Sequence, residues 1–129
     1  METPAYRNRP ELMTELEPLL DVDALLGSVG GDCELLDELA ATFAEEVPGW
    51  IATLRAALAS GDTETLFRVA HGVNGAVGYF RASGVQRPAA DLEAMGRTHN
   101  LEGASAALDH LEDGLLKLNV FLAKTPWRA

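Results

Sequence analysis

Four stretches of the sequence carry apolar residues at intervals of three and four positions, and each stretch follows a residue that can cap a helix. This spacing places the apolar side chains on one face of an α-helix. The capping residues have side-chain oxygens that can accept hydrogen bonds from amides of the first turn, and they are Asp32, Asp62, Ser83 and Asn100. Four main helices are therefore predicted, at about residues 33–59, 63–81, 84–97 and 101–122.

The connections between these stretches are short, as in "ASGD" and "RTHN", and short connections favour antiparallel neighbours. A further short helix is expected at "DVDALLGSV", residues 21–29, and no alternating run of β-branched residues predicts a strand. Pro48 predicts a kink in the first long helix, and Pro88 could delay the regular start of the third. The predicted fold class is all-α, an antiparallel up-down four-helix bundle with a short extra N-terminal helix.

The chain has the size of one ordinary domain. Its 129 residues are 47% hydrophobic, which is enough to fill a single core. Both ends carry proline and polar residues without apolar periodicity. Residues 1–20 are therefore predicted to be an N-terminal tail or linker, residues 21–123 the helical bundle, and residues 124–129 a C-terminal tail.

The net charge of the chain restricts its partners. Ten basic against twenty acidic residues give a formal charge of −10. Nucleic acids and anionic membranes are poor partners for such a chain, because lysine and arginine surfaces bind their phosphates. The single cysteine, Cys33, cannot form an internal disulfide, and no long apolar run or secretory start is present. A cytoplasmic location is therefore expected. The chain is also expected to be a monomer.

The stretch "RVAHGVNGAVGYF", residues 68–80, places one histidine and three glycines inside a predicted helix. On a helical wheel the core stripe falls on the side opposite His71, which should therefore point to solvent. The stripe consists of Leu66, Val69, Val73, Ala76, Val77 and Phe80. An exposed neutral imidazole can attack an activated phosphoryl group near physiological pH. The competing interpretation of His71 is a solvated polar residue.

The residues around His71 favour its interpretation as a nucleophile over that of a solvated polar residue. Gly72, Gly75 and Gly78 together sacrifice roughly 2 to 3 kcal/mol of helix propensity, and the last two should lie on the outward side of the helix with the histidine. The absence of side chains there would let a partner's backbone approach the imidazole. Phe67, one turn earlier on that side, either offers a partner an apolar ring or leans against a neighbouring helix.

The segment "AHGVNGAVGYF" resembles the active helix of histidine-containing phosphotransfer (HPt) domains, whose core motif is His-x-x-Lys-Gly. The likeness continues upstream with the Gly-Gly-Asp cap, the Phe and Pro of the long helix and the Gly-Asp turn. Downstream, "AADLEAMGRTHNLEGASAALDHLE" is similar to the segment that closes the bundle, with Leu92 and Glu93 at the family's distance from the histidine. The resemblance covers most of the chain in one order.

This resemblance implies a four-helix bundle whose exposed histidine relays a phosphoryl group between aspartates of receiver domains in a two-component phosphorelay. His71 would carry the phosphoryl group on the ring nitrogen remote from the backbone. The receiver would supply Mg²⁺ and most of the charge stabilisation, so no cofactor is expected on this chain. The implied partners are response-regulator receiver domains and a hybrid sensor histidine kinase, in cis or in trans. The chain itself shows no ATP-binding or kinase catalytic pattern.

One position departs from the family motif, because Asn74 stands where the family has lysine. An amide can donate a hydrogen bond to a phosphoryl group, but charge-assisted bonds are roughly twice as strong. Arg68 could partly substitute for the lysine or could pair with Glu64, and Arg81 could reach a docked partner. Gly75 keeps the family's glycine. Asn74 also supports an alternative hypothesis, a degenerate module that docks a receiver or kinase without carrying phosphate.

Other candidate residues indicate no further site. His99 and His110 lack the spacing of paired metal ligands, so no metal site is predicted. Gly30 and Gly31 precede a helix but belong to no phosphate-binding loop pattern, and Cys33 is expected to be inert between two acidic residues.

Overall fold

The computed structural model describes residues 21–128, and within that range all regular structure is helical. The predicted all-α fold class is therefore confirmed. The helices are α2 (Val22–Ser28), α3 (Cys33–Ser60), α4 (Thr63–Tyr79), α5 (Ser83–Thr98) and α6 (Ala104–Ala123). The expected N-terminal tail or linker at residues 1–20 lies outside the described residues.

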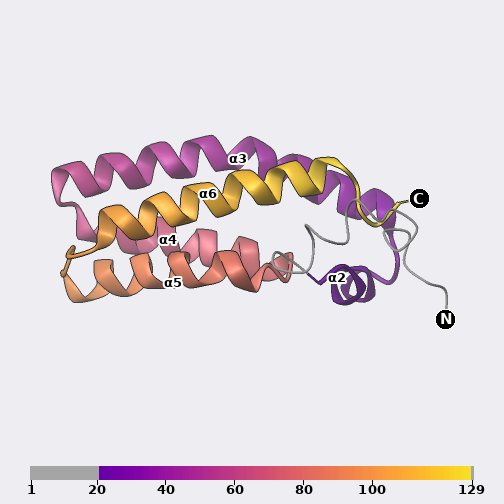
Figure 1. The fold of residues 1–129 in the computed structure, drawn as a ribbon, viewed down its shortest axis with the longest axis horizontal. Helices are drawn as coiled ribbons and strands as arrows, with labels where there is room; N and C mark the ends of the chain where they lie inside the picture. The colour runs from indigo at the N-terminus through magenta and orange to yellow at the C-terminus, as the bar shows by residue number, and fades with distance from the viewer. Residues whose placement is uncertain (1–20, 129) are drawn as a thin grey trace.

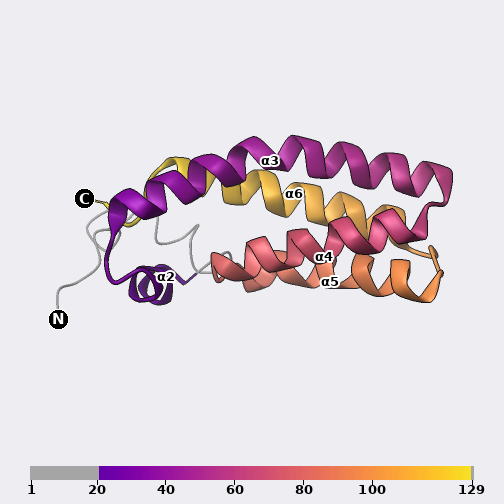
Figure 2. The same ribbon diagram turned by 180° about the vertical axis from the view of Figure 1, so that it is seen from behind.

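The four long helices lie side by side along the length of the molecule and alternate in direction, as Figures 1 and 2 show from opposite sides. Each of α4 and α6 packs against both α3 and α5. The helices α3 and α6 extend past the turn between α4 and α5, and α2 lies beside this extension (Figure 1). The short helix buries Val22 and Leu25 there. The arrangement is the predicted up-down bundle with one additional short helix.

Two of the four predicted helix caps are confirmed. The Asp32 carboxylate accepts a hydrogen bond from the Leu35 amide at 3.0 Å. The Asp62 carboxylate accepts bonds from the Thr65 amide at 3.1 Å and the Thr65 hydroxyl at 2.7 Å. These caps satisfy amides that the first turn of a helix leaves without a partner. They fix the starts of α3 and α4.

The predicted cap at Ser83 is wrong, because Ser83 is already the first residue of α5. The N-cap is Ala82, which makes no side-chain cap bond but whose carbonyl accepts from the amides of Val85 and Gln86. The Ala82 side chain is fully buried. Burial of this residue beneath the turn therefore sets the helix start one residue earlier than the capping rule indicated.

The predicted cap at Asn100 is also wrong. The helix α6 begins at Ala104, and its N-cap is Gly103 at a φ of 81°. The Asn100 side chain instead accepts a hydrogen bond from the Glu102 amide at 3.1 Å. This bond shapes the connection before α6, which is a common alternative use of an asparagine side chain.

Neither proline interrupts its helix. Pro48 lies inside α3, which is helical from Cys33 to Ser60. Pro88 lies inside α5, so the predicted delay of that helix start is wrong. Tertiary packing holds Val85 and Ala89 in the core on either side of Pro88. This packing offsets the backbone hydrogen bond that proline cannot donate.

The core is formed by the facing apolar stripes of the four long helices. On α4 the buried residues are Leu66, Ala70, Val73 and Val77, with Phe80 buried just after the helix. Val69 and Ala76, predicted in the same stripe, are partly buried at its margin. Full burial of a leucine or valine side chain contributes about 1.5–3 kcal/mol. The stripe therefore fixes which face of α4 is left for solvent.

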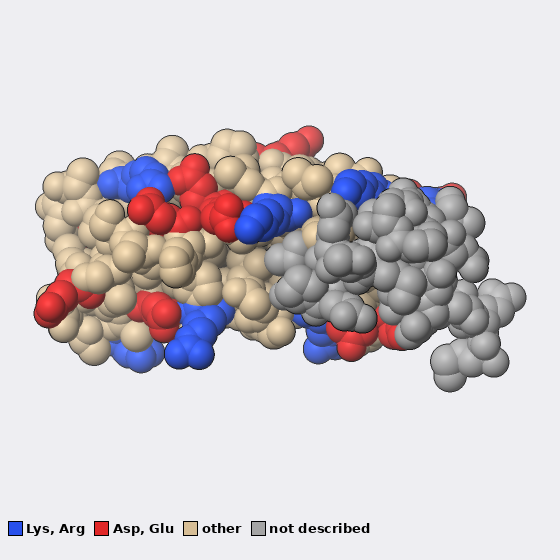
Figure 3. Space-filling model, in the orientation of Figure 1, with Lys and Arg blue, Asp and Glu red and all other residues tan. Residues whose placement is uncertain are grey.

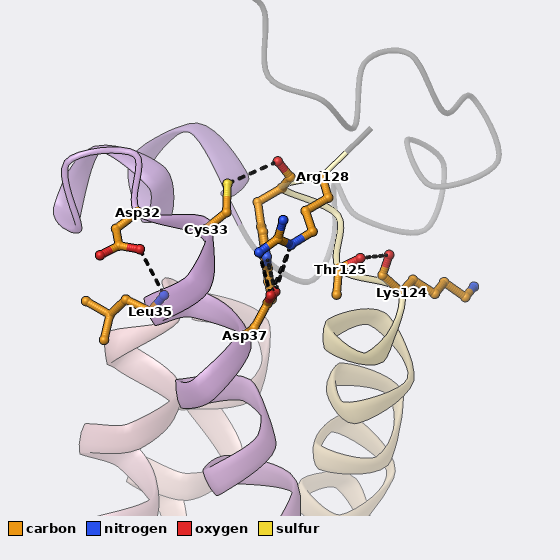
Figure 4. A network of polar contacts seen from close by, with 8 residues as sticks. Asp32, Cys33, Leu35, Asp37, Lys124, Thr125 and Arg128 are labelled. Atoms are coloured by element: carbon orange, nitrogen blue, oxygen red, sulfur yellow. Dashed lines mark hydrogen bonds and ion pairs between the residues drawn. The ribbon is translucent and has the colours of Figure 1, made fainter.

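The segment after α6 packs against the start of α3. Trp127 is 2% exposed, and its indole nitrogen donates to the Asp37 carboxylate at 2.7 Å. The Arg128 guanidinium donates to the same carboxylate at 2.6 and 3.0 Å (Figure 4). The hydrogen bonds from Arg128, and then from Trp127, hold the pKa of Asp37 below its ordinary value. The expectation of a C-terminal tail at residues 124–129 did not include these contacts.

Gly96 permits a close approach of α5 to α4. A Cβ added at Gly96 would lie 2.6 Å from the Phe67 amide nitrogen and 2.8 Å from the Thr63 carbonyl oxygen. Real Cβ atoms do not approach backbone atoms so closely, so any side chain here would push the helices apart. The apolar pattern of the sequence did not indicate this close contact.

We predict that Gly96→Ala lowers the free energy of unfolding by about 1–3 kcal/mol, because the backbone of α4 cannot move aside locally. Gly72→Ala is the matched control, since a Cβ there meets nothing within 4 Å. It should raise the free energy of unfolding by up to about 1 kcal/mol through helix propensity. Urea unfolding of both variants measures the difference, and equal effects would contradict the close-packing role of Gly96.

Candidate functional site

His71 lies within α4 on the face opposite the core, and its side chain is 71% exposed. The adjacent residue Ala70 is fully buried, as is Val73. The predicted outward orientation of the histidine is therefore confirmed. Because the apolar stripe anchors the opposite side of the helix, His71 is presented to solvent from a rigid element rather than from a loop.

Glu93 of the neighbouring helix α5 holds one edge of the His71 ring. The Glu93 Oε1 atom lies 2.8 Å from His71 Nδ1. The Glu93 side chain is only 15% exposed, so the carboxylate is seated between the helices while the imidazole is open. The contact engages Nδ1 and leaves Nε2 as the ring nitrogen available to a partner.

The charge state of Glu93 determines which ring nitrogen carries the proton. The hydrogen bond with His71 is the main cause that lowers the pKa of Glu93, and the Asn74 bond and the charges of His71 and Arg97 act in the same direction against burial. An ionised carboxylate only accepts hydrogen bonds, so His71 must donate from Nδ1. In the neutral imidazole, Nε2 then keeps its lone pair and is the nucleophilic atom.

Asn74 faces α5 rather than the outer side of His71. Its Nδ2 atom donates to Glu93 Oε2 at 3.3 Å, and its Oδ1 atom accepts from Gln86 Nε2 at 3.4 Å. Both ends of the amide are therefore engaged within the protein. The residue that replaces the lysine of the resembled motif contacts the carboxylate that binds His71.

Phe67 is partly buried one turn before His71, and the two rings stack with centroids 6.1 Å apart and planes inclined by 20°. This contact places the Phe67 ring beside the imidazole on the same helix. Phe67 therefore forms part of the surface beside the imidazole.

The three glycines of α4 have different surroundings. A Cβ added at Gly72 or Gly75 would meet nothing within 4 Å, so the surface beside the histidine is open there. Gly78 is only partly exposed, and a Cβ at that position would lie 2.7 Å from Gln86 Nε2. The expectation that Gly78 lies beside open surface is therefore wrong. A side chain from α5 occupies the space next to it.

The two arginines expected near the site are both exposed. Within the described part of the chain Arg68 forms no ion pair, so the expected alternative of a pair with Glu64 is absent. Its charge contributes to lowering the pKa of Asp62. Arg81 follows the end of α4 and adopts a left-handed conformation with a φ of 60°. Arg68 is thus the basic side chain on α4 that is free to meet an anionic group.

In the sequence, Glu93 was indicated only by the family resemblance, and Gln86 was not indicated. Both are polar residues of α5 whose side chains turn towards α4. The available signal was their position on the helix: both are separated by three or four residues from the buried Ala89. Such polar positions at the edge of a core stripe reach the neighbouring helix when the two helices pack closely.

The remaining candidates show no second site. His99 Nδ1 lies 2.7 Å from the Thr63 hydroxyl, and the Cys33 thiol lies 3.7 Å from the Trp127 carbonyl oxygen. His110 lines a shallow groove of about 460 Å³ between α5 and α6. Among residues 21–128 no group of three or more potential ligands could hold a metal ion, and no helix is long and apolar enough to cross a membrane.

Figure 3 views the molecule from the side on which α5 and α6 lie. On this side lysine and arginine side chains are scattered among acidic and uncharged ones and do not gather into one patch. Among the ion pairs of the described residues, Arg55 is paired with Asp109 and Glu112. The described surface visible there resembles no phosphate-binding stripe of a nucleic-acid-binding protein.

Comparison with known proteins agrees with this geometry. The chain matches the family model described as "Hpt domain" over residues 38–119, a range that includes His71, Asn74 and Glu93. Among solved structures it is similar to histidine-containing phosphotransfer protein B (HptB) from Pseudomonas aeruginosa PAO1. The two share 25% sequence identity with a TM-score of 0.78, over 86% of this chain and 96% of that one. No curated protein matches the sequence significantly.

We predict that Glu93→Gln lowers the free energy of unfolding by about 1 kcal/mol at pH 7, since it weakens a charge-assisted bond to a largely exposed imidazole. The pKa of Glu93 is depressed in the folded protein. Its contribution is therefore present above the ordinary glutamate pKa of about 4.3 and is lost as the pH falls through the depressed value.

Unfolding of the wild-type protein and Glu93→Gln by urea at pH 7 and pH 3 measures this effect. The difference in stability between the two proteins should be larger at pH 7. A difference that stays constant between the two pH values would show that the carboxylate charge is not what stabilises the contact.

Proposed function

The chain belongs to the Hpt domain family, and on that premise we propose that His71 carries a phosphoryl group between the aspartates of receiver domains in a phosphorelay. Family membership makes the protein a histidine phosphotransfer protein of phosphorelays. The assignment of the reaction to His71 rests on one observation above all. This histidine is largely exposed while Glu93 engages its Nδ1 atom, so its Nε2 atom is free to react.

The proposed reaction is an in-line displacement at phosphorus. The lone pair of His71 Nε2 attacks the phosphorus of an aspartyl phosphate on the receiver. A nitrogen–phosphorus bond forms, the bond between phosphorus and the aspartate oxygen breaks, and its electron pair leaves with the receiver's carboxylate. Transfer to a second receiver runs the same step in reverse. Mg²⁺ held by the receiver supplies most of the charge stabilisation in this proposal.

Glu93 supports this reaction through the proton on Nδ1. As the bond to phosphorus forms, the imidazole ring gains positive charge, which the adjacent carboxylate at 2.8 Å stabilises. The proton remains on Nδ1 throughout, so no base has to remove it before the attack. The chain therefore contributes to the reaction by positioning the imidazole and by stabilising its charge.

The surroundings of Nε2 are suited to a docked receiver. The positions of Gly72 and Gly75 leave the surface open beside the ring. Arg68 on the same helix is available to pair with a phosphoryl oxygen or with an acidic residue of the receiver. We propose that the module acts as a monomer in the cytoplasm, alone or joined to a hybrid sensor histidine kinase.

A second candidate function is docking of a receiver or kinase without phosphate transfer. The observation that favours it is the engagement of Asn74 with Glu93 and Gln86. No lysine is present at this position, and both ends of the amide that replaces it are engaged within the protein. The same open surface would serve a docking module.

We predict that the protein acquires acid-labile phosphate when it is mixed with a receiver domain that has been phosphorylated by acetyl phosphate. His71→Gln should lose this labelling completely, because an amide nitrogen has no nucleophilic lone pair. Phosphate on the chain is measured by gel electrophoresis with a phosphate-binding additive, before and after acid treatment.

His110→Gln is the matched control, because it removes an exposed histidine from another helix. Labelling that persists in His71→Gln would contradict the assignment. Formation of a stable complex without labelling of the wild-type protein would instead favour the docking function.

A further inference from the structure

Gln86 begins a line of polar contacts that ends at the imidazole. Its Nε2 atom donates to Asn74 Oδ1 at 3.4 Å, and Asn74 Nδ2 donates to Glu93 Oε2 at 3.3 Å. The second oxygen of Glu93 lies 2.8 Å from His71 Nδ1. The line therefore passes from α5 to α4, back to α5 and again to α4. Gln86 itself makes no hydrogen bond with His71.

The direction of these bonds fixes the orientation of the Asn74 amide. An amide group has a donor end and an acceptor end, and a half-turn about its last bond exchanges them. The ionised Glu93 carboxylate can only accept, so the NH₂ end of Asn74 faces it, and the bond from Gln86 to Oδ1 supports this orientation. The reversed amide would set its oxygen against the ionised carboxylate, which can only accept, and would weaken the hold of Glu93 on the ring.

The space for Gln86 depends on Gly78. A Cβ at this position would lie 2.7 Å from Gln86 Nε2 and 3.5 Å from its Cδ atom. The glycine thus leaves room for the amide between the two helices. Gly78 has a packing reason within the protein, whereas Gly75 on the same helix has open space around it. The hydrogen bond and the vacated space are separate observations that both involve Gln86.

We propose that Gln86 is a positioning residue of the phosphotransfer site, which acts through Asn74 and Glu93 to keep the proton of His71 on Nδ1. The importance of Gln86 for phosphate transfer rests on the proposed function. It assigns Asn74 a different role from the lysine of the resembled motif. Asn74 orients the carboxylate that binds the ring and is not the group that contacts the phosphoryl oxygens.

Two glycine variants test the proposal with the same chemical change on one helix. Gly78→Ala should displace the Gln86 amide and increase the fraction of His71 protonated on Nε2. Gly75→Ala should leave that fraction unchanged, because its Cβ contacts nothing within 4 Å. Nitrogen-15 NMR of the imidazole in the free protein at neutral pH measures the fraction of each tautomer directly.

Gln86→Met separates hydrogen bonding from packing. Methionine has a similar length and helix propensity but no donor, so this variant should shift the tautomer as Gly78→Ala does. In both variants the rate of phosphate transfer from a phosphorylated receiver should fall in proportion to the fraction of Nδ1-protonated ring.

Wild-type tautomer fractions in Gly78→Ala and Gln86→Met would overturn the proposal, as would an equal shift in Gly75→Ala. The NMR measurement needs no partner. A failure of the wild-type protein to accept phosphate would therefore contradict the proposed function while leaving the positioning of the ring by Gln86 separately testable.

Discussion

The close packing of α5 against α4 is the contact on which the candidate site depends. At Gly96 the two helices approach so closely that a Cβ would lie 2.6 Å from the Phe67 amide nitrogen. Because the helices are antiparallel, the same approach brings Glu93 to His71 and Gln86 to Asn74 further along α4. A larger residue at Gly96 would separate these pairs. The backbone contact at Gly96 thus sets the distances between the polar groups of the candidate site.

The glycines around His71 illustrate how one residue type serves different physical purposes. Gly96 allows two backbones to meet, Gly78 leaves room for the amide of Gln86, and Gly75 has open surface around it. Helix propensity favours alanine at all three positions by about 1 kcal/mol each. Packing against a backbone requires glycine at Gly96, whereas the neighbour of Gly78 is the end of the Gln86 side chain. At Gly75 the space left by the missing side chain would serve only an external partner.

Sequence predictions that depended on local interactions were confirmed, and those that tertiary packing overrode were wrong. The caps at Asp32 and Asp62 were predicted correctly, because a side chain bonds an amide only three residues away and the interaction needs no other element. Ser83 and Asn100 have the same capping chemistry, yet the helices begin elsewhere. Burial of Ala82 and the turn at Gly103 decide these starts. The contacts of Trp127 and Arg128 with Asp37 join distant parts of the chain and carry no periodic signal.

The spacing of apolar residues along each helix was enough to predict an all-helical bundle with His71 pointing away from the core. The segment around the histidine also indicated the family. Which residues contact the imidazole depends on how the helices pack. Glu93, Asn74 and Gln86 meet because two helices pack at a particular separation and register, and that register depends on side chains from both helices at once.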